Sequence, residues 1–240
     1  MAFGFWLLAL TPSPALVVFD LAGTTVRDRG DVPAAFRAAL EADGTGIDAK
    51  TISEARGSSK RESIRRILST RYPDLERRQL EQRANAVYRV FRGTLMRSFL
   101  ADADLAMPEA LPVFERLRGR DIRLAINTGF DRDIADAILD ATGWPPELFD
   151  AVVTADDVDE GRPSPDMILL SMESVGIRDA GHVAVVGDTR LDLEAGFNAG
   201  AEWCIGVLSG AHDRATLEQA PYTHIVDSVG DVPGLWSEST

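Results

Sequence analysis

Five side chains in this sequence have types and spacings suited to chemistry at phosphorus. Asp20 ends the apolar run "ALVVF" and could attack phosphorus through an aspartyl-phosphate. Asp188 and Asp192 lie four residues apart in "GDTRLD", a spacing that places both on one helical face, and carboxylates are ligands that Mg²⁺ prefers. Thr128 in "NTG" and Arg162 in "GRPSPD" offer a hydroxyl and a cation to phosphoryl oxygens. The set predicts a magnesium-dependent phosphoryl site.

Each of these pieces also has a purely structural interpretation. A Gly-Asp-x-x-x-Asp stretch is often a capped helix start, "NTG" is often a turn, and a single arginine often forms a surface salt bridge. The order of the pieces is more informative, because each follows a strand-like run. Ligands of open parallel sheets bind outside the carboxyl ends of the strands, so the pieces would meet there.

The elements that must position these residues alternate along the chain. Helical patterns separate short runs rich in Val and Ile, and two of these patterns end at Gly143 and Gly176 as C-cap signals. This alternation predicts an α/β fold with a doubly wound parallel sheet. The predicted strands are 15–19, 122–126, 151–155, 182–186 and 203–208.

One segment, 30–102, breaks this alternation. Its patterns are helical throughout, which predicts an all-helical domain inserted after the first strand. The core domain would then comprise 15–29 and 103–240, and residues 1–14 would form an extension. The tail "SEST" is expected to be disordered.

Charge and composition restrict the partners. The formal charge is −13, which argues against nucleic acid, yet segment 30–102 alone carries a net +4. A basic insert facing an acidic body suits a small anionic substrate, although solvated arginines would give the same balance.

One cysteine, Cys204, fits a reducing compartment. The apolar N-terminal run lacks a basic region and is too short to span a bilayer, so a cytoplasmic protein is favoured over cleavage of a signal peptide after Ala15. The sequence is compatible with a homodimer.

The motifs "DLAGTT", "NTG", "RPSPD" and "GDTRLD" resemble those of the haloacid dehalogenase superfamily of hydrolases, from about residue 15 onward. The resemblance implies that Asp20 is the nucleophile and that the helical insert is a cap closing over the substrate. It implies an Mg²⁺ site made by Asp20, the Ala22 carbonyl, Asp188 and Asp192. The implied phosphate-binding residues are Ala22, Gly23, Thr24, Lys60, Asn127, Thr128, Gly129 and Arg162.

Ala22 stands where most phosphatases of this superfamily carry a second aspartate, which protonates the leaving oxygen. One interpretation is an impaired relative. The other is a resemblance to the phosphonatase branch, phosphonoacetaldehyde hydrolase and its relatives, in which alanine occupies this position. Arg162 in place of lysine points to the same branch. That branch cleaves a P–C bond, and a lysine Schiff base accepts the electrons of the carbon leaving group.

Lys60 is the candidate for that lysine. Gly57-x-x-Lys60, followed by a helical pattern, resembles the phosphonatase cap loop. Nearby Arg61, Arg65 and Arg66 would lower the pKa of Lys60 if they lay close to it. A lysine at a helix start is also commonly just solvated. The branch has a histidine three residues after its lysine, where this chain has Ser63, so the loop matches only in part.

The sequence is therefore compatible with three functions. The first is phosphonate P–C hydrolysis that uses Asp20, Lys60, Thr128 and Arg162. The second is a phosphomonoesterase, of the phosphoglycolate phosphatase kind, acting on a small metabolite. The third is a non-catalytic phosphate-binding protein.

Overall fold

The computed structural model describes residues 13–101 and 104–236. Most of the predicted N-terminal extension, residues 1–12, and the tail 237–240 lie outside the described residues, as do residues 102 and 103.

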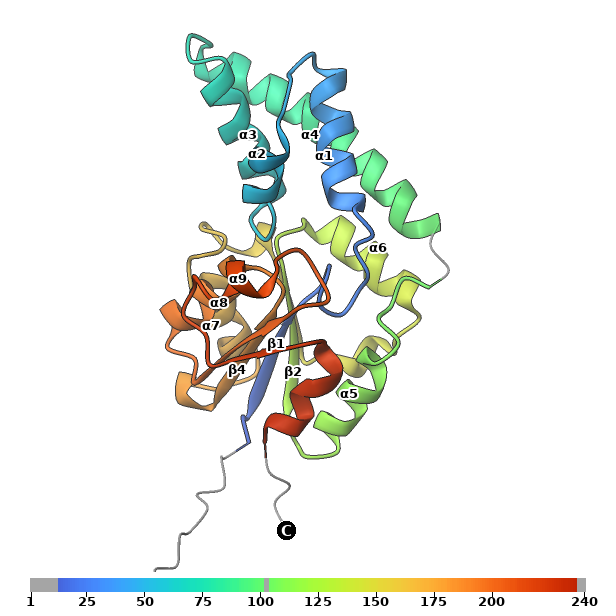
Figure 1. The fold of residues 1–240 in the computed structure, drawn as a ribbon, viewed down its shortest axis with the longest axis vertical. Coiled ribbons are helices and arrows are strands. Elements are labelled where there is room, and N and C mark those ends of the chain that lie inside the picture. The colour runs from blue at the N-terminus through green and yellow to red at the C-terminus, as the bar shows by residue number, and fades with distance from the viewer. Residues whose placement is uncertain (1–12, 102–103, 237–240) are drawn as a thin grey trace, which may run out of the picture.

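A parallel sheet of six strands forms the centre of the fold (Figure 1). Its strand order is β3-β2-β1-β4-β5-β6, the doubly wound arrangement that the sequence predicts. All five predicted strands are present, and the sixth, β6, was missed because it is a short, half-buried edge strand. The strands are β1 (Leu16–Asp20), β2 (Arg123–Thr128), β3 (Ala151–Thr154), β4 (Val183–Gly187), β5 (Trp203–Val207) and β6 (His224–Val226).

Helices cover both faces of the sheet, with α5 and α6 on one side and α7 and α8 on the other (Figure 1). Successive side chains of β1 point to opposite faces. Val17 and Phe19 therefore join the larger apolar cluster, and Leu16 and Val18 join the cluster beneath α7. Because both faces are covered, β1 is apolar until Asp20. The core helices are α5 (Ala110–Arg118), α6 (Arg132–Thr142), α7 (Asp166–Ser174), α8 (Arg190–Ala199) and the short α9 (Arg214–Leu217).

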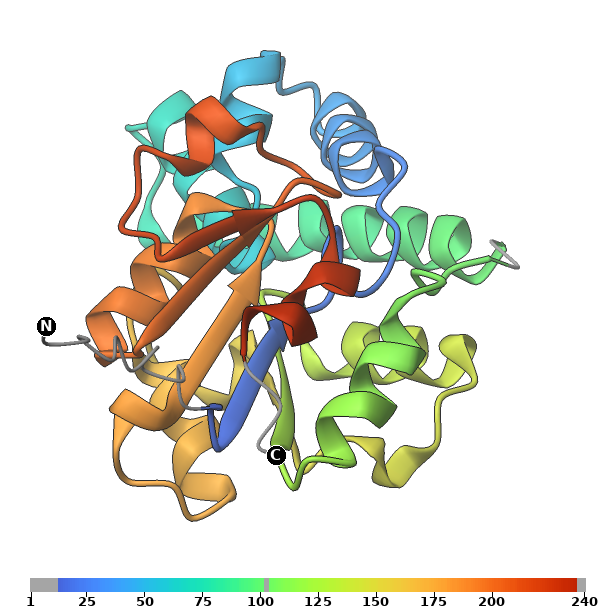
Figure 2. The same ribbon diagram turned by 60° about the horizontal axis from the view of Figure 1, so that its bottom comes forward.

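Four helices stand beyond the carboxyl end of the sheet, where Figure 1 shows them as a separate layer, and in Figure 2 they lie behind the core. Helices α1 and α4 pack along each other, with the rings of Phe36 and Phe91 centred 4.7 Å apart. Within the described part of the insert there is no strand, so the prediction of a parallel sheet with a helical cap is confirmed. The domain boundaries near residues 29 and 102 remain a prediction. The cap helices are α1 (Asp31–Ala42), α2 (Ala49–Glu54), α3 (Lys60–Arg71) and α4 (Arg77–Ala101).

Among the residues that the structure describes, no helix is both long and apolar enough to cross a lipid bilayer.

Candidate active site

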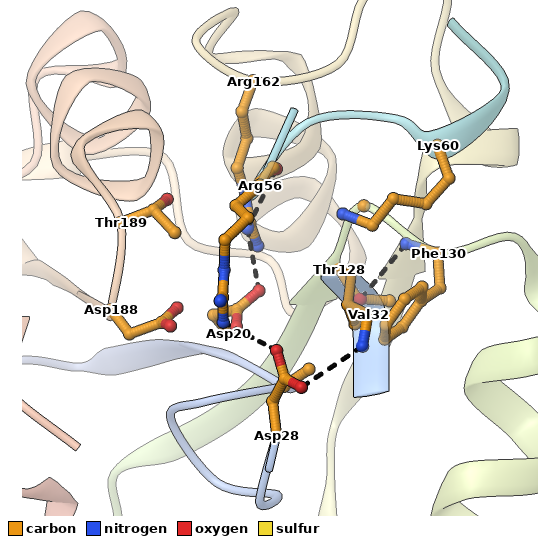
Figure 3. A pocket seen from close by; sticks show the side chains of 13 residues that line it. Asp20, Asp28, Val32, Arg56, Lys60, Thr128, Phe130, Arg162, Asp188 and Thr189 are labelled. Carbon is orange, nitrogen blue, oxygen red and sulfur yellow. Dashed lines mark hydrogen bonds and ion pairs between the residues drawn. The ribbon is translucent and has the colours of Figure 1, made fainter. Parts of the chain in front are cut away.

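The site begins at the carboxyl ends of the two central strands. Asp20 is the last residue of β1, and Asp188 directly follows β4. Their side chains lie close together on one wall of a cavity (Figure 3). Burial raises the pKa of Asp20 to about 6, although Arg162 opposes the shift. Burial and the charge of Asp20 also raise the pKa of Asp188 well above its usual value.

Arg162 connects the carboxylates of the core. Its Nη1 contacts Asp20 Oδ1 at 2.8 Å and Asp192 Oδ1 at 2.5 Å. Its Nη2 donates to the carbonyl oxygen of Asn127 at 2.5 Å and to Asn127 Oδ1 at 2.8 Å. Burial acts against the charge of Arg162, but Asp192 and Asp20 outweigh it and raise the pKa of the guanidinium. Arg162 is therefore a fixed, fully charged group beside the candidate nucleophile.

The geometry does not favour Asp192 as a metal ligand, contrary to the sequence prediction. Its Oδ2 accepts hydrogen bonds from the backbone N–H and the hydroxyl of Thr189, which caps helix α8, and its Oδ1 faces Arg162. Both oxygens are thus engaged with hydrogen-bond or ion-pair partners. Asp192 holds Arg162 in place, a role that the four-residue spacing alone could not reveal.

The remaining predicted ligands suit Mg²⁺. Two buried carboxylates, Asp20 and Asp188, face one another, and Ala22 lines the same cavity and could contribute its carbonyl oxygen. Burial is the main cause of the raised pKa values of both carboxylates, and a divalent cation bound there would stabilise their charged forms. No cluster of three or more acidic, histidine or cysteine side chains suited to a metal occurs among the described residues. The third ligand that the resemblance implies is the Ala22 carbonyl, which is not a side chain.

The "NTG" turn forms the opposite wall. Thr128 ends β2, and its hydroxyl accepts a hydrogen bond from the Phe130 N–H at 3.3 Å. Asp131 then caps helix α6 through the Ile134 N–H. Thr128 and Gly129 line the cavity, as a phosphoryl-binding role requires.

Three predicted phosphate-binding residues lie behind the walls. Asn127 is buried and holds Arg162. Gly23 packs against Asp188, since a Cβ on Gly23 would come 2.2 Å from Asp188 Oδ2. The hydroxyl of Thr24 is fully buried and has no partner among the described residues. These three residues support the wall rather than line the cavity.

Lys60 enters the cavity from the cap. It begins helix α3 and is only 6% exposed. Its Nζ donates to the carbonyl oxygen of Ser58 at 2.9 Å and lies 5.2 Å from the ring centre of Phe130. Burial is the main cause that lowers the pKa of Lys60 to about 8, with Arg162 and Arg56 adding to it and Asp20 opposing it. About a tenth of the amine would therefore be neutral at pH 7, far more than for an ordinary lysine.

The arginines expected to lower this pKa lie elsewhere. Arg61 stacks on the ring of Tyr88, 4.0 Å from its centre, and pairs with Asp131 at 3.6 Å. Arg65 and Arg66 are exposed on helix α3. The cations that act on Lys60 are instead Arg162, from the core, and Arg56, which lies four residues before it.

Ser63 is buried three residues after Lys60. Its hydroxyl is 2.6 Å from the hydroxyl of Ser58, which in turn donates to the carbonyl oxygen of Ala55. This pair braces the loop whose Ser58 carbonyl holds Lys60. Ser63 therefore has a positioning role in this chain, in the place where the resemblance led us to expect a proton-transferring histidine.

The cap loop reaches the core because two glycines leave room for it. Gly57 has a φ of +79°, and a Cβ there would lie 2.4 Å from the hydroxyl oxygen of Thr189. A Cβ on Gly129 would lie 2.6 Å from the carbonyl oxygen of Ser58. Since real Cβ atoms do not come this close, glycine at both positions lets cap and core touch. The cavity between cap and core is small and only partly open, which suits a small ligand.

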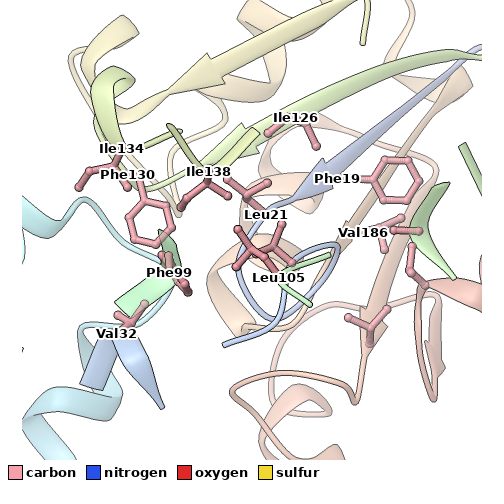
Figure 4. Packing of buried hydrophobic residues seen from close by; sticks show 14 of the residues in the cluster. Phe19, Leu21, Val32, Phe99, Leu105, Ile126, Phe130, Ile134, Ile138 and Val186 are labelled. Carbon is pink, nitrogen blue, oxygen red and sulfur yellow. The ribbon is translucent and has the colours of Figure 1, made fainter. Parts of the chain in front are cut away.

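Apolar packing continues from the site into the cap. Phe130 lies next to the "NTG" turn, and its ring meets that of Phe99 of α4 edge-on, with centres 6.1 Å apart. Val32 of α1 belongs to the same cluster (Figure 4). This contact fixes the cap over the strand ends.

Sequence reasoning missed three polar residues of the cavity wall, namely Thr189 within "GDTRLD" and the pair Arg56 and Asp28. Arg56 Nη2 donates to Asp28 Oδ2 at 2.6 Å, and both residues line the cavity. Neither belongs to a motif. Only their positions beside predicted motifs could have indicated them, because Arg56 directly precedes the Gly57-x-x-Lys60 loop and Asp28 closely follows "AGTTV".

Comparison with known proteins agrees with this geometry. The family model for haloacid dehalogenase-like hydrolases matches residues 14–200. A phosphonoacetaldehyde hydrolase from Nitratidesulfovibrio vulgaris is 31% identical over 246 residues, covering 90% of this chain and 87% of the relative. The "Probable phosphatase IndB" of Dickeya dadantii is 32% identical over 222 residues, covering 91% of this chain and 92% of the relative.

Among solved structures, a phosphonoacetaldehyde hydrolase-like protein from Oleispira antarctica superposes with a TM-score of 0.78 at 24% identity, covering 94% of this chain and 92% of the other. At this identity the likeness concerns the fold.

The chain belongs to the haloacid dehalogenase-like hydrolase family. It is an enzyme of this kind and resembles the phosphonatase branch within it. Membership in a family of hydrolases counts against the third interpretation, a phosphate-binding protein without catalysis.

Proposed function

We propose that this protein is a magnesium-dependent hydrolase that cleaves the P–C bond of a small phosphonate bearing an aldehyde, of the phosphonoacetaldehyde type. The observation that carries the proposal is the position of Lys60. Its amine is buried in the same cavity as Asp20, and its pKa is lowered to about 8. An alkoxide leaving group would not need such an amine, whereas a carbon leaving group needs an electron sink.

The reaction begins at the lysine. The neutral amine of Lys60 adds to the aldehyde carbon, and loss of water forms an iminium ion. Partial deprotonation of the Lys60 amine makes this addition possible, because a protonated amine has no lone pair. The ring of Phe130 and the Ser58 carbonyl fix the amine before substrate arrives.

Asp20 then attacks phosphorus. A bond forms between a carboxylate oxygen of Asp20 and phosphorus while the P–C bond breaks, and its electron pair moves through the carbon to the iminium nitrogen to give an enamine. Arg162 and Thr128 bind the phosphoryl oxygens. Bound at Asp20, Asp188 and the Ala22 carbonyl, Mg²⁺ would offset the charge of the nucleophile and of the phosphoryl oxygens.

Water completes both halves of the reaction. Protonation of the enamine and hydrolysis of the resulting iminium ion release acetaldehyde and restore Lys60. A second water hydrolyses the aspartyl-phosphate to release phosphate and restore Asp20. The sum is one phosphonoacetaldehyde and one water giving acetaldehyde and phosphate, with no oxidant or reductant.

A paired assay tests this function. Purified protein with Mg²⁺ is offered phosphonoacetaldehyde in one reaction and p-nitrophenyl phosphate in the other, and phosphate or nitrophenol is measured. We expect phosphate from the phosphonate, with kcat/KM at least tenfold above that for the ester, and loss of both reactions in Asp20→Asn. Turnover confined to the ester would overturn the proposal.

The second candidate is a phosphomonoesterase. The observation in its favour is the 32% identity to a relative named as a probable phosphatase, combined with Ser63 in place of the expected histidine. This candidate requires a proton donor for the leaving oxygen, and Ala22 cannot supply one. It would be chosen if small sugar phosphates were hydrolysed and phosphonates were not.

A further inference from the structure

Arg56 is a cavity residue to which the reaction described above gives no role. It lies between α2 and α3, four residues before Lys60, and its side chain reaches into the cavity between Asp188 and Thr128 (Figure 3). The side chain is 17% exposed. A largely covered guanidinium that lines a ligand cavity is costly unless it is paired, and the pairing shows what it can bind.

The partner of Arg56 is held rigidly. The Asp28 side chain is 1% exposed, and its Oδ1 accepts hydrogen bonds from Gly30 N at 3.0 Å and from Val32 N at 3.3 Å, where helix α1 begins. Its Oδ2 accepts from Arg56 Nη2 at 2.6 Å. A guanidinium has five N–H donors in a fixed fork, so pairing through Nη2 orients the group without exhausting it.

Charge balance within the cavity restricts the ligand atom. Arg56 is neutralised by Asp28, and Arg162 is matched by Asp192 and Asp20. The pair of Arg56 and Asp28 therefore offers directed N–H groups without a surplus of positive charge. Such a pair suits a neutral oxygen acceptor better than a second anion.

The loop places Arg56 and Lys60 together. A Cβ on Gly57 would lie 2.4 Å from Thr189 Oγ1, so the loop that carries Arg56 and Lys60 packs closely on the core. The charge of Arg56 also reaches Lys60 and Asp188. A ligand whose organic part meets Lys60 therefore lies within the reach of Arg56.

We propose that Arg56, oriented by Asp28, is a substrate-binding residue that donates a hydrogen bond to the oxygen on the carbon next to the phosphorus-bearing carbon. The inference rests on the proposed function and extends it from reaction type to substrate recognition. The preferred ligands are small phosphonates that carry a carbonyl or hydroxyl oxygen at that carbon.

The test compares two ligands that cannot form a Schiff base. Dissociation constants of ethylphosphonate and 2-hydroxyethylphosphonate are measured by calorimetry on the Mg²⁺-loaded protein. We expect the hydroxyl compound to bind about tenfold more tightly to the wild type, as one hydrogen bond to a charged group would give. In Arg56→Gln the two constants should agree within about twofold. Exposed Arg65, on helix α3, provides the matched control, and Arg65→Gln should keep the wild-type ratio.

Because the measured quantity is a ratio, a general loss of affinity does not imitate the expected result. If Arg56→Gln fails to fold, Arg56→Lys is measured in its place. Lysine keeps a positive charge for Asp28 but lacks the forked N–H groups of a guanidinium, so the ratio of the two dissociation constants should fall below about threefold. A wild-type ratio near one, or an unchanged ratio in the folded Arg56 variant, would overturn the inference. Lys60→Ala should keep the ratio. If phosphonoacetaldehyde is not hydrolysed while the ratio holds, the proposed function fails and the assignment of Arg56 stands.

Discussion

The two sides of the cavity are built differently. On the core side, strand ends supply Asp20 and Asp188, and Arg162 joins Asp20 to Asp192 through contacts of 2.8 and 2.5 Å. On the cap side, one short loop supplies Arg56 and Lys60. Within this loop the Ser58 carbonyl accepts a hydrogen bond from the Lys60 amine. The loop itself is held by the Ser58–Ser63 hydroxyl pair and by the close approach of Gly57 to Thr189.

The difference indicates a division of labour. A rigid set of charges at the strand ends suits the phosphoryl group, which is common to many substrates. A lysine and an arginine on a cap loop suit the organic part, which distinguishes one substrate from another. In this account the core residues bind and attack the phosphoryl group, and the cap residues determine which bond to phosphorus breaks.

The sharpest test of the core side is Asp20→Asn. An amide cannot attack phosphorus, so phosphate release from any substrate should fall by about 10⁴-fold or more, the scale seen when a nucleophile is removed. Steady-state rates with a phosphonate and with an ester provide the measurement. Retention of either rate would show that the two sides are not divided in this way.

Lys60→Ala should separate the two sides. Release of phosphate from phosphonoacetaldehyde should fall by about 10³-fold, within the range for loss of a group that acts on the leaving group. Any residual ester hydrolysis should change by less than about threefold, because the core side is intact. The chain has only one other lysine, Lys50, so Lys50→Ala is the matched control. Equal losses on both substrates would contradict the division.

The pH dependence sharpens the same comparison. The pKa of Lys60 is lowered to about 8, so below that pH most of the amine is protonated and cannot attack the aldehyde. The rate of P–C cleavage should rise about tenfold per pH unit well below 8 and level off above it. The pH profile of ester hydrolysis should lack this rise. A profile of kcat/KM between pH 6 and 9.5 tests this, and a flat profile for the phosphonate would count against a neutral lysine.

The smallest expected effect concerns Ser63. In Ser63→Ala the hydroxyl contact to Ser58 is lost, and the carbonyl that holds Lys60 is less well fixed. We expect a loss of roughly three- to tenfold in P–C cleavage, in line with one neutral hydrogen bond. Ester hydrolysis should be unaffected, and Ser63→Thr, which keeps the hydroxyl, should restore part of the loss. A larger effect on the ester than on the phosphonate would contradict a positioning role.

The sequence predicted the core side better than the cap side. Asp20, Thr128, Arg162 and Asp188 stand at or after strand-like runs, and parallel strands necessarily bring their carboxyl ends to one edge. The short edge strand β6 was missed because three half-buried residues give little periodicity. Asp192 was assigned to the metal because spacing shows which residues share a face but not what each oxygen contacts.

On the cap side, the position of Lys60 came from a loop resemblance, but its surroundings could not be predicted. Asp28 and Arg56 are 28 residues apart in sequence and meet only because the cap folds back on the linker at the start of α1. Likewise, the main cations acting on Lys60 are Arg56 and the core residue Arg162, whereas Arg61 pairs with Asp131. Such contacts depend on tertiary packing and not on local pattern.

The central claim is that the amine of Lys60 bonds covalently to the substrate. Phosphonoacetaldehyde and borohydride are added to the Mg²⁺-loaded protein, and the modified residue is located by peptide mass spectrometry, with Lys50→Ala and Lys60→Ala treated alike. The account predicts a reduced adduct on Lys60 in the wild type and in Lys50→Ala, and none in Lys60→Ala. Phosphate release from phosphonoacetaldehyde without any adduct on Lys60 would contradict it.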